Sequence, residues 1–187
     1  MNNTKNEFKK INAIFSKCVS ASTLSLSKLM HEKVYHNDNQ IKELRLGEIG
    51  NIADHNEVFA VYLKCEGLLR VGFLFYLPLS EATHLANHLL GKTSKKLTAM
   101  GKSAIMEVGN LMANSFLNES GLMIHASISG CTIDMLKIVL QEPVTHVADM
   151  SDKIIFSDII FRTENNIKLH FAIIMDPVHT KNFLQVK

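Results

Sequence analysis

The sequence predicts an α+β fold made of two pseudo-symmetric halves, each running from a long helix through a strand and a variable segment to an antiparallel β-hairpin, a proline and a short helix. Aligning Pro78 with Pro177 also aligns the turn at residues 66–67 with the turn at 165–166. The match lies in the order of the elements and not in residue identity. A repeat of this length predicts two fused halves, at about 6–92 and 97–187, that share one core in a single domain over 1–187.

The first half begins with a helix predicted over residues 6–30, because apolar residues recur there every three or four positions. The apolar stripe comprises Phe8, Ile11, Phe15, Cys18, Val19 and Leu26. The second part of this helix is rich in serine, a small residue that allows close packing at some cost in helix propensity. Residues 31–56 are polar, with a short strand expected near 33–35 and one short helix or strand near 44–49.

A β-hairpin is predicted next, from strands at 57–66 and 69–77. The second strand is rich in Phe and Leu with little alternation, which predicts burial on both faces. Pro78 closes this strand. A helix predicted at 80–90 then ends at Gly91, because glycine readily adopts the left-handed conformation that follows many helices.

The second half opens with a central helix predicted over 97–118, after a polar linker at 92–96, and Thr98 is its candidate cap. Helical spacing predicts one inward face for it. That face comprises Leu97, Met100, Ala104, Val108, Leu111, Met112, Ser115 and Phe116. The half continues with a strand at 122–128, a turn at Gly130, a helical or extended segment at 134–140 that Pro143 breaks, paired strands at 153–162 and 167–175, and a short final helix at 178–184.

The composition is ordinary for a globular protein, with 47% hydrophobic and 20% charged residues among 187. The net charge of +2 argues neither for nor against a charged partner. The absence of Trp and of any block of Lys or Arg argues against a nucleic-acid partner. Cys18, Cys65 and Cys131 are far apart, as is typical of reduced cysteines in a cytosolic protein. No signal peptide and no apolar run long enough to span a bilayer is evident, so we expect a cytoplasmic protein with no membrane partner.

A polar stripe occupies another face of the central helix, where Ser103, Glu107, Asn110 and Asn114 follow one another at i, i+4, i+7 and i+11. A carboxylate and a carboxamide are therefore expected to project in the same direction, one turn apart. On spacing alone, the simplest interpretation is a solvated face, because most amphipathic helices have one and short motifs often match by chance.

The string from Ser103 through Glu107 to Asn110, continued by Leu111-Met112-Ala113, resembles the active-site helix of the CheC/CheX/FliY family of response-regulator phosphatases, the CheC version in particular. That family's pattern is Asp or Ser, three residues, Glu, two residues, Asn. The resemblance covers nearly the whole chain and is strongest over 58–118, and it implies one CheC-like domain with exposed long helices. The family often has a proline downstream of the helix, and this chain has none in 124–133.

The resemblance implies a phosphatase that hydrolyses the aspartyl phosphate of a CheY-like response regulator, in chemotaxis or a related two-component pathway. Asn110 would orient the attacking water, because a carboxamide both donates and accepts hydrogen bonds, and Glu107 would pair with the regulator's lysine. Ser103, Met106 and Asn114 are the candidate partner-binding residues, although the Ser103 hydroxyl has the alternative of bonding to its own helix. No cofactor of the chain's own is expected, since the Mg²⁺ belongs to the regulator.

One active helix is expected, although many proteins of this family carry the motif in both long helices. The first helix has Glu7 as its only Glu, and Lys10 stands where the Asn would be, so we interpret this helix as structural. Glu48 and Asn51 repeat the motif's spacing, but the glycines around them weaken a helix, and a loop is expected there.

His84 and His88 have an i, i+4 spacing that zinc sites use, but no third ligand is evident, so a solvated pair and no metal site are expected. Composition leaves a Ser-His-Asp triad open, yet the chain has neither a nucleophile-elbow motif nor a phosphate-binding glycine loop. The alternative to an enzyme is a binding module, either like the CheC-type domains of flagellar switch proteins or an adaptor for a CheD-like deamidase. Monomer and homodimer both stay open.

Overall fold

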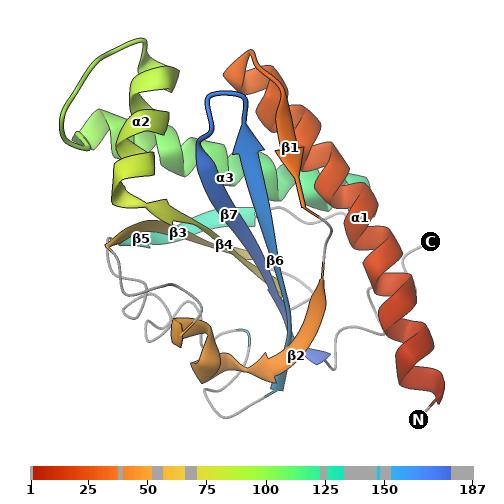
Figure 1. The fold of residues 1–187 in the computed structure, drawn as a ribbon. Helices are drawn as coiled ribbons and strands as arrows, with labels where there is room; N and C mark the ends of the chain where they lie inside the picture. Colours follow the sequence, from red (N-terminus) through yellow and green to blue (C-terminus); the bar gives the residue numbers. More distant parts are fainter. Residues whose placement is uncertain are drawn as a thin grey trace.

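The computed structural model of the chain describes residues 2–37, 40–51, 57–65, 71–122, 126–132, 147 and 153–177. Within these residues the fold has two layers, with helices α1, α2 and α3 packed on one face of a seven-stranded antiparallel sheet (Figure 1). The prediction of an α+β fold with antiparallel hairpins is therefore confirmed. Three predicted elements lie outside the described residues: the turn at 66–67, the segment at 134–140 and the final helix at 178–184.

Helix α1 (Asn2–Met30) buries the predicted apolar stripe against α3 and the sheet. Of that stripe, the side chain of Phe8 lies outside the described ones. The serine-rich part of α1 makes the close helix contact that small residues permit. The buried Ser22 hydroxyl donates to the backbone oxygen of Met112 at 2.9 Å, and Ser115 donates to Ser25 at 2.8 Å. These contacts tie the second part of α1 to α3 where the two helices cross (Figure 1).

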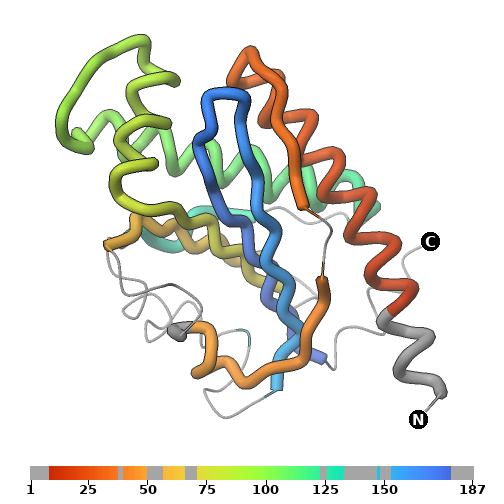
Figure 2. Tube along the Cα trace, viewed as in Figure 1, coloured from red at the N-terminus to blue at the C-terminus, as the bar shows by residue number. Residues whose placement is uncertain are grey.

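After α1 the chain follows the outer edge of the sheet. Strands β1 (Val34–His36) and β2 (Ile41–Arg45) pair in succession with one long strand, β6 (Lys153–Thr163). Figure 2 shows this edge, where β1 runs beside a hairpin formed by residues more than 100 positions later in the sequence. β2 was not predicted, because its side chains stay largely exposed and carry little apolar pattern. The segment at 46–51 forms the 3₁₀ helix η1 (Leu46–Asn51) where a loop or short element was expected.

Two hairpins form the centre of the sheet. Strands β3 (Val58–Cys65) and β4 (Val71–Pro78) pair with each other, as do β6 and β7 (Lys168–Met175), and β4 pairs with β7. The strand order is β1-β6-β7-β4-β3-β5, with β2 also on β6. β4 is buried on both faces, as predicted from its unbroken Phe and Leu content.

The predicted turn at Gly130 is wrong. Gly130 lies inside β5 (Ala126–Thr132), which pairs with β3 along the edge of the sheet. The register shifts there, so that Tyr62 is opposite Gly130 while Leu63 is opposite Ile128. One extra residue in β5 is thus accommodated as a bulge within a continuing strand, and glycine in a strand often marks such a bulge.

Each face of the sheet has its own core. The larger one lies under the helices and contains the side chains of β3 and β4 that point to that side, such as Phe59, Phe73 and Phe75. The smaller one lies on the opposite face, where Leu46 and Ile49 of η1 belong to the same buried cluster as Tyr62 and Phe156. Burial on both faces explains why the central strands read as continuous apolar runs.

Helix α2 (Leu79–Leu90) begins directly after β4 and ends at Gly91, whose φ of 59° is left-handed as predicted. It packs its buried Ala82, Leu85 and Ala86 toward the larger core and toward α3 (Ala99–Ser120). Both helices thereby pack on the same face of the sheet. In the view of Figure 1, α3 runs behind α2 and α1.

The inward face predicted for α3 is partly wrong. Met100 is 57% exposed and Leu111 is half-buried, whereas Val108, Met112 and Phe116 are buried as predicted. The remaining buried positions of this helix are Gly101, Ile105, Gly109, Ala113 and Leu117. The face is rotated because small residues allow the close approach: an added Cβ on Gly109 would lie 3.3 Å from the Cβ of Phe75 on β4.

Candidate functional site

The candidate site lies on α3, which is one unbroken helix of 22 residues. Its start is fixed by Thr98, whose hydroxyl accepts from the Gly101 backbone N–H at 3.1 Å, as predicted. Its end is fixed by Gly121, at a left-handed φ of 76°, whose N–H donates to Asn118 at 3.2 Å. A helix capped at both ends and packed on α1, α2 and the sheet is a rigid support for side chains on its outer face.

The outer face of α3 carries the predicted acid and amide. Glu107 and Ser103 are exposed, and Asn110 is half-buried. The Ser103 hydroxyl donates to the Ala99 backbone oxygen at 3.2 Å, so the alternative of a bond within its own helix is realised. Its oxygen still has acceptor capacity toward solvent. Met106 is half-buried and packs against the larger core beside this face.

Asn114 does not belong to the exposed stripe, which corrects its expected position. Its side chain is half-buried and turned toward β5, where its Oδ1 accepts from the Ala126 backbone N–H at 3.0 Å. Its Nδ2 donates to the Ala126 oxygen at 3.3 Å and to the Asn110 Oδ1 at 2.9 Å. The amide is occupied inside the molecule because β5 passes beside this turn of α3. The sequence offered only an i, i+4 pair of Asn residues as a signal.

Glu107 and Asn110 are therefore both accessible from one side of a single helix. A carboxylate there can accept from a partner's ammonium group, and a carboxamide can hold a water molecule through both its donors and its acceptor. The arrangement supplies positioning and charge pairing, not a nucleophile.

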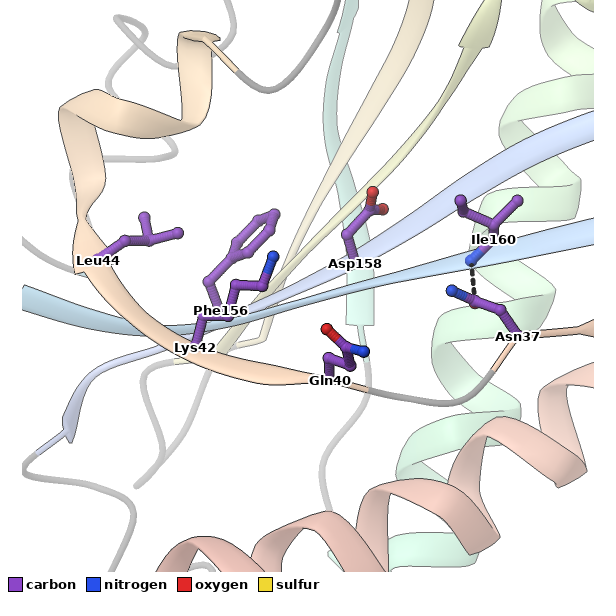
Figure 3. A pocket seen from close by; sticks show the side chains of 7 residues that line it. All are labelled: Asn37, Gln40, Lys42, Leu44, Phe156, Asp158 and Ile160. Atoms are coloured by element: carbon purple, nitrogen blue, oxygen red, sulfur yellow. Dashed lines mark hydrogen bonds between the residues drawn. The ribbon is translucent and has the colours of Figure 1, made fainter.

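A second feature lies across the sheet. A cavity of about 370 Å³ opens beside β2 and β6 (Figure 3). It is lined by Asn37, Gln40, Lys42, Leu44, Phe156, Asp158 and Ile160. The Asp158 Oδ2 accepts from the Tyr76 hydroxyl and from the His170 Nδ1, each at 3.0 Å. Burial, and then the Asp158 charge, raise the pKa of Tyr76, so its hydroxyl stays a donor. These bonds cross-link three strands of the sheet.

Within the described part of the chain, no group of three or more His, Cys, Asp or Glu side chains is placed to hold an ion, and the histidine pair on α2 lies in other surroundings. His84 is exposed. The His88 Nε2 lies 2.9 Å from the Met30 oxygen, to which it donates, and so it links α2 to the end of α1. Glu48 accepts from the Arg45 N–H at 2.7 Å, a local contact within the segment that repeats the motif's spacing.

Comparison with known proteins places these features in context. No protein-family model matches the chain. The curated CheY-P phosphatase CheC of Bacillus subtilis strain 168 is 24% identical over an alignment of 110 residues, and the match covers 54% of this chain. The match spans 53% of that relative, about half of its length.

Solved structures match over nearly the whole chain. FliY of Thermotoga maritima has a TM-score of 0.77 at 14% identity, covering 97% of this chain and 95% of its own. CheX of Borrelia burgdorferi, solved in complex with CheY, BeF₃ and Mg²⁺, has a TM-score of 0.57 at 12% identity, covering 86% and 97%. The chain has the CheC/CheX/FliY fold. The family resemblance read from the Glu107/Asn110 helix is confirmed at this level.

The CheC/CheX/FliY fold also occurs in FliM. FliM of Helicobacter pylori, solved in complex with FliG, has a TM-score of 0.71 at 9% identity, covering 91% of this chain and 93% of its own. Similar structures thus include proteins solved with quite different partners. Within the described residues, no helix is both long and apolar enough to cross a membrane.

Proposed function

We propose that this chain is a phosphatase of the aspartyl phosphate of a CheY-like response regulator, in chemotaxis or related two-component signalling. The observation that carries the proposal is the outer face of α3, where Glu107 is exposed and Asn110 half-buried on one capped, uninterrupted helix. A purely structural helix has no need of this pair. The 24% identity to a CheY-P phosphatase over half of the chain adds support.

The proposed chemistry is mostly positioning. The regulator's own Mg²⁺ and lysine activate its phosphoryl group, so an in-line water is what a second protein has to provide. Asn110 holds that water through its carboxamide, and Glu107 pairs with the regulator's lysine and thereby docks α3 against the phosphorylated site. Ser103 and Met106, which flank the pair, would contact the regulator. Orienting a water in this way accounts for about 10² to 10³ in rate.

The proposal includes a single site on a pseudo-symmetric domain spanning 1–187. The strand order supports the two-half architecture, since β1 of the first half pairs with β6 of the second, β5 of the second pairs with β3 of the first, and β4 pairs with β7 at the centre. Exchanging the two halves therefore reproduces the same order. In this scheme α1 corresponds to α3, but its sequence lacks the acid and amide.

The test measures loss of phosphoryl groups from phosphorylated response regulators of the same organism. The wild-type protein should accelerate the decay of its cognate regulator, and Asn110→Ala should remove most of that acceleration, about 10²-fold. Glu107→Gln should weaken binding to the regulator activated with beryllofluoride. Asn118→Ala and Glu119→Gln, on exposed positions of the same helix, are the matched controls and should leave both measurements unchanged. Equal decay with wild-type protein and Asn110→Ala would reject the enzyme.

A second candidate is a non-enzymatic binding module, which the similarity in shape favours. The TM-score with FliM, which was solved in complex with FliG, is 0.71, against 0.57 with CheX. In that case the chain would bind its partner, a regulator, a flagellar-switch component or a CheD-like deamidase, without turnover. Binding to an activated regulator that survives Asn110→Ala, with no accelerated decay for the wild-type protein, is the outcome that favours this candidate.

A further inference from the structure

Asn110 holds the attacking water in the proposed reaction. Its side-chain amide has two orientations, which differ only by exchange of its O and N atoms. In water both orientations occur freely. Only a neighbour with a fixed hydrogen-bonding direction can select one of them. The structure supplies such a neighbour, because Asn114 lies one turn further along α3 and contacts the Asn110 side chain directly.

The direction is set at β5. The Ala126 backbone N–H, 3.0 Å from the Asn114 Oδ1, can only donate. The Ala126 backbone oxygen, 3.3 Å from the Asn114 Nδ2, can only accept. Both contacts select the same orientation of the Asn114 amide, with its oxygen toward the strand N–H. The backbone of the strand therefore determines which atom of Asn114 is the donor.

The donor then determines the orientation of Asn110. The Asn114 Nδ2 lies 2.9 Å from the Asn110 Oδ1 and 3.0 Å from the Asn110 backbone oxygen, and its two hydrogens are shared among these oxygens and that of Ala126. An –NH₂ group of Asn110 in this place would face another donor. The oxygen of Asn110 therefore faces Asn114. Among the described residues no hydrogen bond occupies its –NH₂ group, so this group and the second lone pair of its oxygen can face water or a partner.

We propose that Asn114, held by the Ala126 backbone, is a positioning residue that orients the Asn110 carboxamide before a regulator binds. This inference rests on the proposed phosphatase function and extends it, since it assigns a residue outside the Glu-x-x-Asn pattern. Asn114 touches neither water nor phosphate in this role; it acts through Asn110. Pre-orientation spares the complex the ordering of one polar side chain, an effect of about 2- to 10-fold in rate.

The decisive variant is Asn114→Asp, which keeps an acceptor for the Ala126 N–H but presents an oxygen instead of a donor to the Asn110 Oδ1. Single-turnover dephosphorylation by this variant should fall about 2- to 10-fold or more, with unchanged affinity for the regulator activated with beryllofluoride. In the Asn110→Ala background, the same change should have no further effect on the rate. Asn118→Asp, the same substitution at an exposed position one turn on, is the control and should match the wild-type protein.

A measurement independent of activity completes the test. With ¹⁵N-labelled asparagine, the side-chain amide resonances of Asn110 should shift in Asn114→Asp and in the second variant, Asn114→Ala, but not in Asn118→Asp. Three outcomes would overturn this inference and leave the proposed function standing. They are a wild-type dephosphorylation rate for Asn114→Asp, the same fold loss of rate from this change in the Asn110→Ala background as in the wild-type protein, and unshifted Asn110 amide resonances. Absence of turnover by the wild-type protein on every regulator would instead overturn the proposed function, and the positioning role of Asn114 with it.

Discussion

Replacing Phe116 with Ala should destabilise the protein far more than replacing Met100, although the sequence pattern places both on the inward face of α3. The Phe116 side chain is 1% exposed, and its ring centroid lies 5.2 Å from that of Phe15 and 5.5 Å from that of Phe73, both in edge arrangements. Truncating such a ring costs about 3–5 kcal/mol, and the lost ring pairs place the expected value in the upper part of that range. Met100 is 57% exposed, so its loss should cost less than about 0.5 kcal/mol.

The assay is equilibrium unfolding in urea followed by far-UV circular dichroism, because the chain has no Trp to report by fluorescence. Phe116→Leu, which keeps most of the volume, should lose only about 1 kcal/mol and serves as the measurable intermediate if Phe116→Ala approaches the total stability of the domain. A loss below about 1 kcal/mol for Phe116→Ala would refute the burial of this ring between α1 and the sheet. Similar losses for Met100→Ala and Phe116→Ala would refute the placement of Met100 outside the buried face of α3.

Two further predictions concern a cap and a buried thiol. Thr98→Ala should lower the free energy of unfolding in urea by about 0.5–2 kcal/mol, because the Gly101 N–H loses its acceptor. Thr98→Ser keeps the hydroxyl and should retain most of that stability. Equal losses for the two variants would contradict the cap. Burial, with a smaller effect from the Glu119 charge, raises the pKa of Cys18 from 9.0 to about 12, so its stabilising contribution is complete below pH 9.0 and is lost as the pH rises from there toward 12. Cys18→Ala should therefore flatten the decline of the unfolding free energy between about pH 9 and 12, measured by urea titration at each pH, and an unchanged decline in this variant would contradict the raised pKa of the thiol.

Local periodicity was sufficient for much of the fold. The stripe on α1 from Ile11 onward and the unbroken apolar run of β4 both reflect side chains that are buried repeatedly along the element. The face of α3 was harder to predict because this helix has several neighbours. Gly101 lies against α2, where an added Cβ would be 2.9 Å from the Cβ of Ala86, and Gly109 lies against β4. Glycines carry no apolar signal, so a pattern built on large residues points the wrong way at both contacts.

The candidate site divides in the same manner. The common direction of Glu107 and Asn110 follows from helix geometry alone and was predictable from their spacing. The inward turn of Asn114 was not, because it depends on the backbone of Ala126, which reaches α3 only when β5 joins the sheet. β2 was missed for a related reason: an edge strand with exposed side chains has little pattern until its partner β6 is known.

The crossed pairing of the outer strands has a consequence for how this protein can be divided. A chain cut within the loop at 92–96 would yield two pieces, and each would keep a hairpin while its outermost strand belonged beside the other piece's hairpin. Neither piece could satisfy its exposed strand edges alone, so the two would have to complement each other to regain the sheet. Helix α3 packs on helices and strands from both pieces, so its position on the sheet depends on the fold of both.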